Sequence, residues 1–344
     1  MPPKITKTRE VYLSLKKIAM SLNPNDPLPG TIRHFAQKYS VNHKTVEAAV
    51  ARLKRNGFIT AQPRLGLRVS PFRPSADEDA PSLLYVYGGW RDPDGAHKIM
   101  ADAAGLVAER AGIRMHHVKA SRFESMLPMA AEGSIPCAII SYFSPYPGLD
   151  VVLEKFSALG VRICTIDEQR RGFDAVVLDN RRIGRQLGRL LFTPASHRRV
   201  LLCQRYLFAQ PEYERDEGLR EVMMEMKVPH SRVVWFSHYN HRDAPTLREA
   251  LARLFNGGVV VDAVFMQTAW GVEQLREACG DAGVPVPFVV AVDTEETLKR
   301  TGISGVAVSV KEMGVRAAEM VLDRLRNPSA KPRIVSLEGR IYMP

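Results

Sequence analysis

The chain has 344 residues, long enough for two or three domains, and its 45% hydrophobic and 25% charged residues are typical of a globular protein. No apolar run reaches the ~18 residues that a membrane-spanning helix needs, and the N-terminus lacks the apolar stretch of a secretory signal. We therefore expect a cytoplasmic protein without membrane contact. The four cysteines are scattered with no CxxC pair, which argues against a disulfide framework and against a zinc site.

The net charge of +11 is concentrated at one end of the chain. Residues 1–75 contain 14 Lys and Arg side chains and only three acidic ones, whereas the other 269 residues hold 34 of each sign. A basic segment attached to a neutral body is the charge distribution expected for a protein that binds a polyanion.

The basic segment predicts three helices and a hairpin. Residues 8–22 place apolar side chains at helical spacing on one face and Lys16 and Lys17 on the other. Helices are also predicted over 31–39 and 43–57, separated by three residues, and residues 58–69 predict a two-stranded hairpin with a basic tip. Two helices joined by so short a turn are typical of a helix-turn-helix, whose second helix presents its first residues to the major groove of DNA.

Residues 8–70 resemble the winged helix-turn-helix of the GntR family of transcription regulators. The resemblance rests on Leu28-Pro29, Ile32-Arg33, the run Val41-Asn-His-Lys-Thr-Val46, and the segment from Leu53 to Val69. It implies contacts with double-stranded DNA from Arg33, Asn42, His43, Lys44 and Thr45, and from Arg64 and Gly66 at the wing tip.

Two departures from the family pattern and several alternatives accompany this interpretation. Gly30 is an extra residue before the Arg-containing helix, and His43 stands where the family often has Arg. The residues alone also allow a basic winged helix that contacts only proteins. Independently of that alternative, Arg33 alone could be a solvated charge on the helix surface, and His43 could equally be a phosphate contact or a surface residue without a role.

The rest of the chain alternates apolar strands with helical patterns. Residues 71–82, with three prolines and an acidic cluster, predict a linker between a domain over 1–70 and a domain over 83–344. Strands are predicted over 83–87, 114–119, 137–143, 161–166, 175–178, 198–204, 233–236, 262–266 and 288–292. Continuous apolar strands alternating with helices favour an α/β body with parallel sheets covered on both faces.

This body resembles the effector-binding domain of the lactose-repressor (LacI) family, which shares its bilobed fold with periplasmic sugar-binding proteins. The matching pieces are Val177-Leu-Asp-Asn180 with the helix that follows, Arg215-Asp-Glu-Gly218-Leu219, and the run from Asp262 to Asp293. The resemblance implies a small molecule, a sugar or related metabolite, bound between two lobes at the C-terminal ends of the strands. The implied ligand contacts are Trp90, Asp167, Arg215, Thr268 and Asp293.

The chemistry of these residues suits a polyol, with one departure. Carboxylates accept hydrogen bonds from adjacent hydroxyls, the arginine fork donates to ring oxygens or to a carboxylate, and Trp90 would stack on a sugar ring. Thr268-Ala269 stands where the family has Asn-Asp, so an acidic, modified or larger ligand also remains open. As alternatives, the two aspartates would cap helices, Arg215 would form a surface salt bridge, and Trp90 would pack within a lobe.

Catalytic and cofactor motifs are missing from the sequence. It contains no GxxxxGK[ST], GxGxxG, GxSxG or HExxH, so we expect no cofactor, no metal and no enzymatic activity. The expected function is a ligand-responsive repressor that binds a palindromic operator as a homodimer. The alternatives are a DNA-binding protein without small-molecule control, an effector-binding protein whose basic module anchors nucleic acid nonspecifically, and an enzyme whose site the sequence does not reveal.

Overall fold

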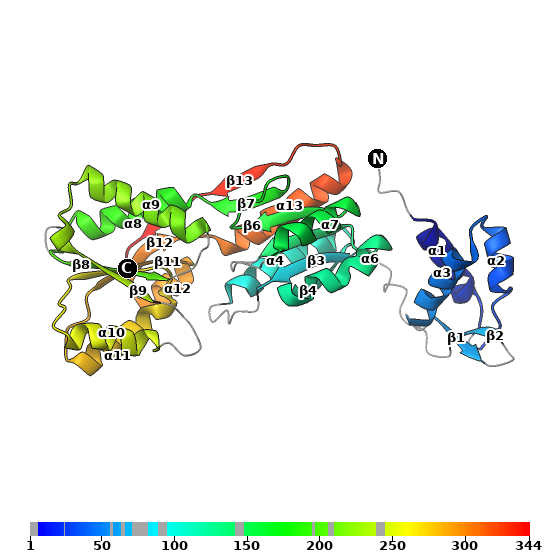
Figure 1. Ribbon diagram of the computed structural model, residues 1–344, viewed down its shortest axis with the longest axis horizontal. Helices are drawn as coiled ribbons and strands as arrows, with labels where there is room; N and C mark the ends of the chain where they lie inside the picture. The colour runs from blue at the N-terminus through cyan, green and yellow to red at the C-terminus, as the bar shows by residue number, and fades with distance from the viewer. Residues whose placement is uncertain are drawn as a thin grey trace.

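The computed structural model describes residues 6–23, 25–55, 58–62, 66–70, 82–88, 95–141, 148–194, 197–205, 210–238 and 245–344. An N-terminal module of three helices and a short hairpin precedes a larger body of two α/β lobes (Figure 1). The predicted linker over 71–82 lies outside the described residues except for Ser82, which begins the first strand of the body. None of the helices in the described ranges is long and apolar enough to cross a membrane.

The N-terminal module has the helices and the hairpin that its sequence predicts. It consists of α1 (Lys7–Ser21), α2 (Ile32–Lys38), α3 (His43–Arg55), β1 (Ile59–Gln62) and β2 (Gly66–Val69), and the two strands pair antiparallel. Its large, fully buried apolar side chains include those of Tyr12, Leu15, Phe35, Leu53 and Phe58. Helical spacing of the apolar residues thus produces one small core of its own beneath the three helices.

The extra residue Gly30 lies in the turn before α2. Its φ of +151° is a conformation that L side chains rarely adopt, and a Cβ there would collide with the ring of His34. The preceding Leu28 donates its N–H to the carbonyl oxygen of Leu67 at 2.9 Å, which fixes this segment against β2. The insertion is therefore confined to a turn and leaves α2 and α3 intact.

The first half of the body, here called the N-lobe, is built on a parallel six-stranded sheet with the order β13-β7-β6-β5-β3-β4. Its elements are β3 (Ser82–Tyr87), α4 (Ala96–Arg110), β4 (Arg114–Lys119), α5 (Ala120–Phe123), η2 (Glu124–Met126), α6 (Leu127–Ala131), β5 (Cys137–Ser141), α7 (Leu149–Ala158), β6 (Arg162–Ile166), β7 (Asp174–Leu178), α13 (Val310–Arg326) and β13 (Ile334–Leu337). Along β3, Leu83 and Tyr85 pack with α4 and α13, whereas Leu84 and Val86 pack on the opposite face with α7. Burial on both faces explains why this strand is continuously apolar.

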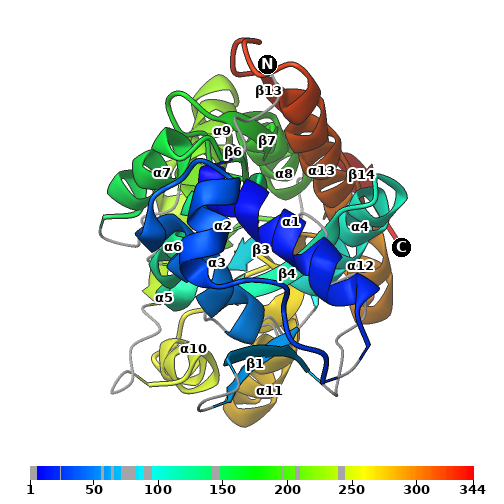
Figure 2. The same cartoon turned by 90° about the vertical axis from the view of Figure 1, so that its right-hand side faces the viewer.

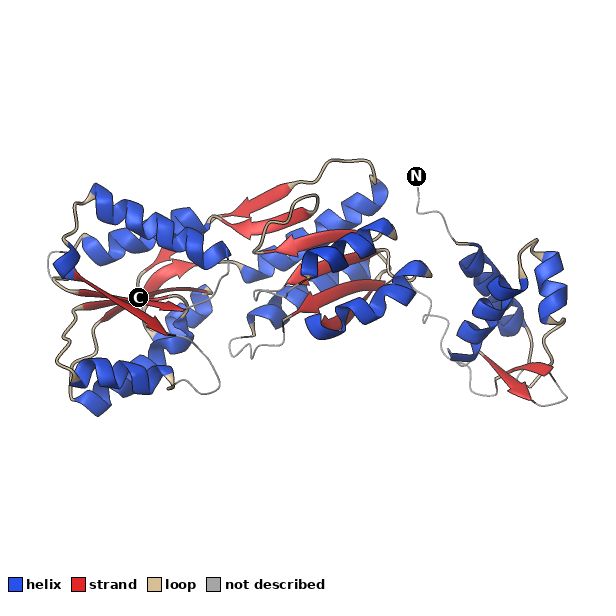
Figure 3. Cartoon of the chain, in the orientation of Figure 1, coloured by secondary structure: helices blue, strands red, loops and turns tan. Residues whose placement is uncertain are grey.

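The second half, the C-lobe, repeats this architecture with the strand order β14-β12-β11-β10-β8-β9. Its elements are α8 (Asn180–Phe192), β8 (Val200–Arg205), α9 (Gln210–Glu225), η3 (His230–Arg232), β9 (Val233–His238), α10 (Leu247–Asn256), β10 (Ala263–Met266), η4 (Ala269–Gly271), α11 (Val272–Ala282), β11 (Phe288–Asp293), α12 (Glu295–Thr301), β12 (Ser304–Ala307) and β14 (Arg340–Tyr342). Only β14, at one edge, is antiparallel to its neighbour. Helices lie on both sides of each sheet, as the colouring by secondary structure shows (Figure 3).

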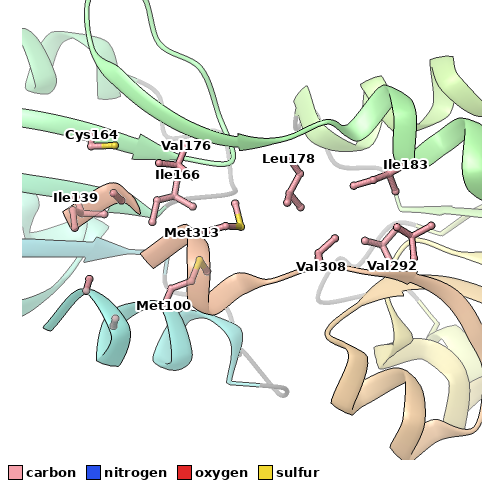
Figure 4. Packing of buried hydrophobic residues seen from close by; sticks show 14 of the residues in the cluster. Met100, Ile139, Cys164, Ile166, Val176, Leu178, Ile183, Val292, Val308 and Met313 are labelled. Carbon is pink, nitrogen blue, oxygen red and sulfur yellow. The ribbon is translucent and has the colours of Figure 1, made fainter. Parts of the chain in front are cut away.

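The chain passes between the lobes three times: after β7, after β12, and between β13 and β14. Apolar packing continues through these crossings, because Leu178, Ile183, Val308 and Met313 belong to one buried cluster that contains residues of both lobes (Figure 4). The lobes are therefore joined at the crossings by shared apolar packing as well as by the backbone.

A buried ion pair fastens the C-terminal segment to the N-lobe. The Arg324 guanidinium of α13 donates to both carboxylate oxygens of Asp174, at 2.6 and 3.0 Å, and both side chains are almost fully buried. Asp174 also accepts from the backbone N–H of Arg333 at 2.8 Å, and Arg324 donates to the carbonyl oxygen of Lys331 at 2.8 Å. These bonds hold the start of β13 beside β7.

The sequence predicts the fold class and most of the elements correctly. The α/β body with parallel sheets and the N-terminal helix-turn-helix are both confirmed, and every strand predicted in the body is present, to within two residues wherever its predicted ends are described. The prediction over 137–143 ends at Ser141, and its last two residues lie outside the described ranges. Sequence patterning does not predict β12, β13 and β14, which are only three or four residues long.

Candidate functional site

The start of α3 carries the predicted contacts with DNA. His43 and Lys44 are exposed in the first turn of the helix. Asn42, just before it, accepts hydrogen bonds at Oδ1 from the backbone N–H of Thr45 at 2.8 Å and from the Thr45 hydroxyl at 2.7 Å. Asn42 and Thr45 thus form the N-terminal cap of α3, which leaves His43 and Lys44 as the more accessible pair.

The other predicted DNA contacts lie on α2 and at the wing. Arg33 is exposed in the first turn of α2. Gly66 begins β2 with a φ of +76°, and no atom lies within 4 Å of where its Cβ would be, so backbone conformation and not crowding favours glycine here. Arg64 lies outside the described residues. The structure therefore places Arg33, His43 and Lys44 on the accessible surface of one small module.

A second group of polar side chains gathers where the lobes meet, and we call it the interlobe site: Asp167, Asn180, Arg215 and Gln267. Asp167 follows β6 in the N-lobe, Asn180 begins α8 directly after the first crossing, and Arg215 and Gln267 lie on α9 and after β10 in the C-lobe. The C-terminal ends of strands from both lobes thus supply the site, as the α/β topology predicts.

Arg215 is the centre of this group. It is only 8% exposed, its Nε donates to Asn180 Oδ1 at 2.7 Å, and its Nη1 donates to the Gln267 side-chain and backbone oxygens at 3.2 and 3.3 Å. The alternative interpretation of Arg215 as a surface salt bridge is wrong, because these neighbours are neutral and the side chain is buried. Its hydrogen-bond partners are neutral, and Asp167 of the N-lobe is one of the carboxylates with which it interacts electrostatically.

Asp167 supplies a carboxylate to the same place. Its Oδ1 is buried without a hydrogen-bond partner, and its backbone has a left-handed φ of +63°. Burial raises the pKa of Asp167 to about 6, although Arg215 and a hydrogen bond from Asn180 act in the opposite direction. A strained residue with an unsatisfied buried oxygen is typical of a binding site, because a ligand hydroxyl there would supply the absent donor.

Two glycines set the position of Arg215. The helices α8 and α9 cross so closely that a Cβ at Gly184 would collide with the backbone carbonyl of Arg215, and a Cβ at Gly218 would collide with that of Arg181. From the sequence, Gly218 is recognisable only as part of the family pattern. Its physical role is to let α9 approach α8, which brings Arg215 within reach of Asn180.

Asp293 and Thr268 lie on the C-lobe side of this region. Asp293 accepts hydrogen bonds from the backbone N–H groups of Ala269 at 3.2 Å and Thr294 at 2.8 Å. Thr294 itself caps α12, accepting from Thr297 at 3.2 Å. Half-buried Thr268 precedes η4 and makes no side-chain capping bond. Asp293 thus fixes the 268–269 turn, and this backbone contact lies where the family pattern has Asn-Asp.

Some contributions to this region are not predicted by the sequence. His97 Nδ1 lies 3.0 Å from Ser141 Oγ at the C-terminal end of β5. A pocket lined by residues 169–173, Gln210, Pro332 and Ile334 shares no residue with the interlobe site. Asn180 is missed too, although its place directly after a crossing strand could have indicated it. Trp90 lies outside the described residues. Within the described part of the chain no cluster of three or more His, Cys, Asp or Glu residues could hold a metal.

Two family models match the chain. Residues 7–69 match "Bacterial regulatory proteins, gntR family", and residues 190–342 match "Periplasmic binding protein-like domain". Among curated proteins, no relative matches the chain in sequence.

Several solved structures share the fold. A LacI family transcriptional regulator from Enterococcus faecium with bound ribose is 15% identical, with a TM-score of 0.64 over 75% of this chain and 96% of that one. The transcriptional regulator CelR in complex with cellobiose is 17% identical, with a TM-score of 0.64 over 91% and 98% of the two chains. A LacI family regulator, CCPA, from Weissella paramesenteroides with bound sucrose is 11% identical, with a TM-score of 0.61 over 76% and 97%. The chain thus joins an N-terminal segment that matches the gntR family model to a body that shares the fold of LacI family regulators and matches, over residues 190–342, the periplasmic-binding-protein-like model.

Proposed function

We propose that the chain is a ligand-responsive transcription regulator whose affinity for a DNA operator changes when a small molecule binds between the two lobes. One observation carries the ligand half of this proposal: Asp167 of the N-lobe, with an unpartnered buried oxygen, lies beside buried Arg215 of the C-lobe. A ligand that satisfies both would favour one arrangement of the lobes, because its two contacts come from different lobes.

The ligand that fits this site best is a sugar or a related polyhydroxylated metabolite. Asp167 offers a hydrogen-bond acceptor and Arg215 a charged donor within the same site, which suits adjacent hydroxyl and ring oxygens. Ligands of this class are bound in the Enterococcus, CelR and Weissella structures. Thr268 and Asp293 would contribute at the edge, and Trp90 would stack on the ring.

The winged helix would bind double-stranded DNA as part of a homodimer. Lys44 and His43 at the start of α3 would reach the major groove, Arg33 would read a base, and Asn42 and Thr45 would orient the helix start. Arg64 and Gly66 would contact DNA at the wing. Replacing Arg33 with Ala should cost about 1–3 kcal/mol on the operator and relax specificity at one base, whereas equal losses on operator and random DNA would contradict a base-reading role.

The remaining parts of the proposal concern organisation. The DNA-binding domain would span residues 1–70, a linker 71–82, and the effector domain 83–344, in a cytoplasmic protein without enzymatic activity. The ligand would either relieve repression, by weakening operator binding, or act as a co-repressor, by strengthening it. A coupling of about 1–3 kcal/mol between the two sites corresponds to a ~5–150-fold change in operator affinity.

The DNA half is tested by selection from a random double-stranded library with the full-length protein at ~0.15 M salt, where nonspecific binding has a Kd of only ~10⁻⁴–10⁻⁶ M. We expect an enriched inverted repeat. No enrichment, with or without cell extract to supply a co-repressor, would contradict operator recognition and would favour a nonspecific nucleic-acid anchor.

The ligand half is tested with a panel of sugars and sugar acids. We expect at least one compound to raise the melting temperature of the wild-type protein and to change its operator affinity. Arg215→Ala should lose both responses and still bind the operator. A variant that responds like the wild type would show that the interlobe site is not the effector site.

A further inference from the structure

The N-terminal module touches the body through an arginine of the recognition helix. Arg52, in the last turns of α3, is only 9% exposed, although most basic side chains of the module point to solvent. Its guanidinium lies 4.3 Å from the ring centroid of Tyr12 on α1. A buried guanidinium needs polar partners to offset its lost hydration, and stacking on a tyrosine ring does not supply them all.

The polar partners of Arg52 belong to the N-lobe. Arg52 Nη2 donates to the Ser134 hydroxyl, and Nη1 lies 3.4 Å from a carboxylate oxygen of Glu132. A second arginine, Arg9 of α1, donates to the backbone carbonyl of Gly133 between them. Figure 2, which faces the module, shows α1 to α3 in front of the N-lobe, and Figure 1 shows α6 on the side of the N-lobe that faces the module. Two arginines on two helices therefore hold one three-residue turn.

This turn, residues 132–134 and here called the receptor turn, has a backbone fixed by several hydrogen bonds within the N-lobe. Gly133 has a φ of +73° and donates its N–H to Ala130 at 2.8 Å, and the Ser134 N–H donates to Met129 at 3.0 Å, so the turn closes the end of α6. The Ser134 carbonyl accepts from Ser82, the first residue of β3, at 2.9 Å. A Cβ at Gly133 would lie 3.0 Å from Arg9 Nη1, so a larger residue would crowd the arginine.

The same turn leads directly into β5, which spans the N-lobe. The strand starts at Cys137, three residues after the turn, and ends at Ser141, the hydrogen-bond partner of His97 near the interlobe site. The receptor turn and the ligand region thus lie at opposite ends of one buried strand. A ligand-induced change in the position of the lobes could therefore reach the module through the buried strand β5.

We propose that Arg9 and Arg52 dock the DNA-binding module on the 132–134 turn, and that the docked state fixes the orientation of the recognition helix for the operator. The docking itself stands on the contacts above, and only its effect on DNA rests on the proposed function. His43 and Lys44, at the other end of α3, stay exposed in the docked state, so docking and DNA binding are compatible.

Docking can be measured without DNA through the reactivity of one introduced thiol. All four native cysteines are buried, so Ser134→Cys would place beneath Arg52 a thiol that the docked module covers and that undocking would expose. Labelling by a thiol reagent should be slow in this otherwise wild-type protein and several-fold faster when Arg9→Ala or Glu132→Gln is added. Lys7→Ala is the matched control for Arg9→Ala, because it removes the same charge from an exposed position of α1.

A second thiol position separates undocking from general loosening of the lobe. The thiol introduced by Ser125→Cys lies on the exposed face of η2 in the same lobe, and its labelling rate should not respond to Arg9→Ala or Glu132→Gln. Unchanged labelling of the Ser134→Cys thiol in both variants would overturn the docking proposal, as would equal acceleration at the two thiol positions.

The effect on DNA has a sign that electrostatics alone does not predict. Glu132→Gln removes a negative charge, which by itself would strengthen DNA binding. If the docked state orients the recognition helix, this variant should instead bind the selected inverted repeat several-fold more weakly. Glu124→Gln, which removes the same charge from an exposed ion pair with Lys155, should not weaken binding. Stronger binding by both variants would refute the orienting role. If the wild-type protein selects no operator, the proposed function fails while the thiol experiment still tests docking.

Discussion

Replacing Asp167 with Asn should stabilise the protein and at the same time abolish its ligand response. The carboxylate of Asp167 is buried with one oxygen unpartnered, so its ionised form is poorly hydrated in the folded state. Asn has nearly the same shape, carries no charge, and tolerates the left-handed φ of +63° at this position. The substitution therefore removes the charge and leaves the backbone unchanged.

The size of the effect follows from the pKa. Burial raises the pKa of Asp167 from 3.8 to about 6, and each pKa unit corresponds to ~1.36 kcal/mol. The folded state binds this proton more tightly than the unfolded state, so its stability falls as the pH rises from about 4 to about 6. Above pH 7 the cost of ionisation is about 3 kcal/mol, of which Asp167→Asn should recover about 1–3 kcal/mol. Below about pH 3 Asp167 is protonated in both the folded and the unfolded state and the gain should vanish, whereas at pH 4.5 about a third of it remains.

Urea unfolding of wild type and variant at pH 4.5 and pH 8 provides the assay. The difference in free energy of unfolding should be large at pH 8 and small at pH 4.5. Glu168→Gln is a suitable control, because Glu168 is adjacent but paired with Arg170 at 2.7 Å, and its loss should not stabilise. The reasoning is refuted if Asp167→Asn destabilises the protein equally at both pH values, since the carboxylate would then be a structural group.

Three further predictions concern other parts of the molecule. Gly218→Ala should lower the free energy of unfolding in urea by about 1–3 kcal/mol and weaken the ligand response, because the added methyl group pushes α9 away from α8. Gly280→Ala is the control: no atom lies near the position of its Cβ, so this substitution should be neutral or stabilising. Arg324→Met leaves the buried carboxylate of Asp174 unpaired and should lower the free energy of unfolding by about 3–5 kcal/mol; a loss below 1 kcal/mol would show that the pair is dispensable. Lys44→Ala should weaken binding to all DNA sequences alike and reduce the salt slope of binding by about one; a loss confined to one sequence would make it a base reader.

The sequence predicts those parts of the fold that local patterns determine. Strands such as 83–87 are buried on both faces and therefore continuously apolar, and the helices of the module show regular apolar spacing. By contrast, β13 and β14 are short, partly exposed strands that form because they pair with β7 and β12, far away in the chain. Pairing with these distant strands makes residues 334–337 and 340–342 extended, so the local residue pattern of these segments does not reveal them as strands.

The candidate site divides in the same way. Asp167 and Arg215 are predicted through the family resemblance, and the structure brings them together. The partners that shape them are not predicted: Asn180 orients Arg215, and Gly184 permits the close helix crossing. The contact of Arg52 with Ser134 joins the N-terminal module to the N-lobe, and no periodicity or motif in either part of the chain encodes such a pair. In the sequence, Arg52 is one of several basic residues of a predicted helix, and no neighbouring residue marks it as an interdomain contact.

The connectivity of the body affects how such a chain can be rearranged at the level of its gene. The lobes share three strand-to-strand or strand-to-helix passages, and the final one places β13 in one lobe and β14 in the other, so no single cut separates them. The winged helix enters the body only once, at Ser82, and is transferable as a cassette. A transplanted module would nevertheless need arginines equivalent to Arg9 and Arg52, or a recipient body with a different receptor turn. Domain shuffling among such regulators should therefore leave matched residues on both sides of this contact.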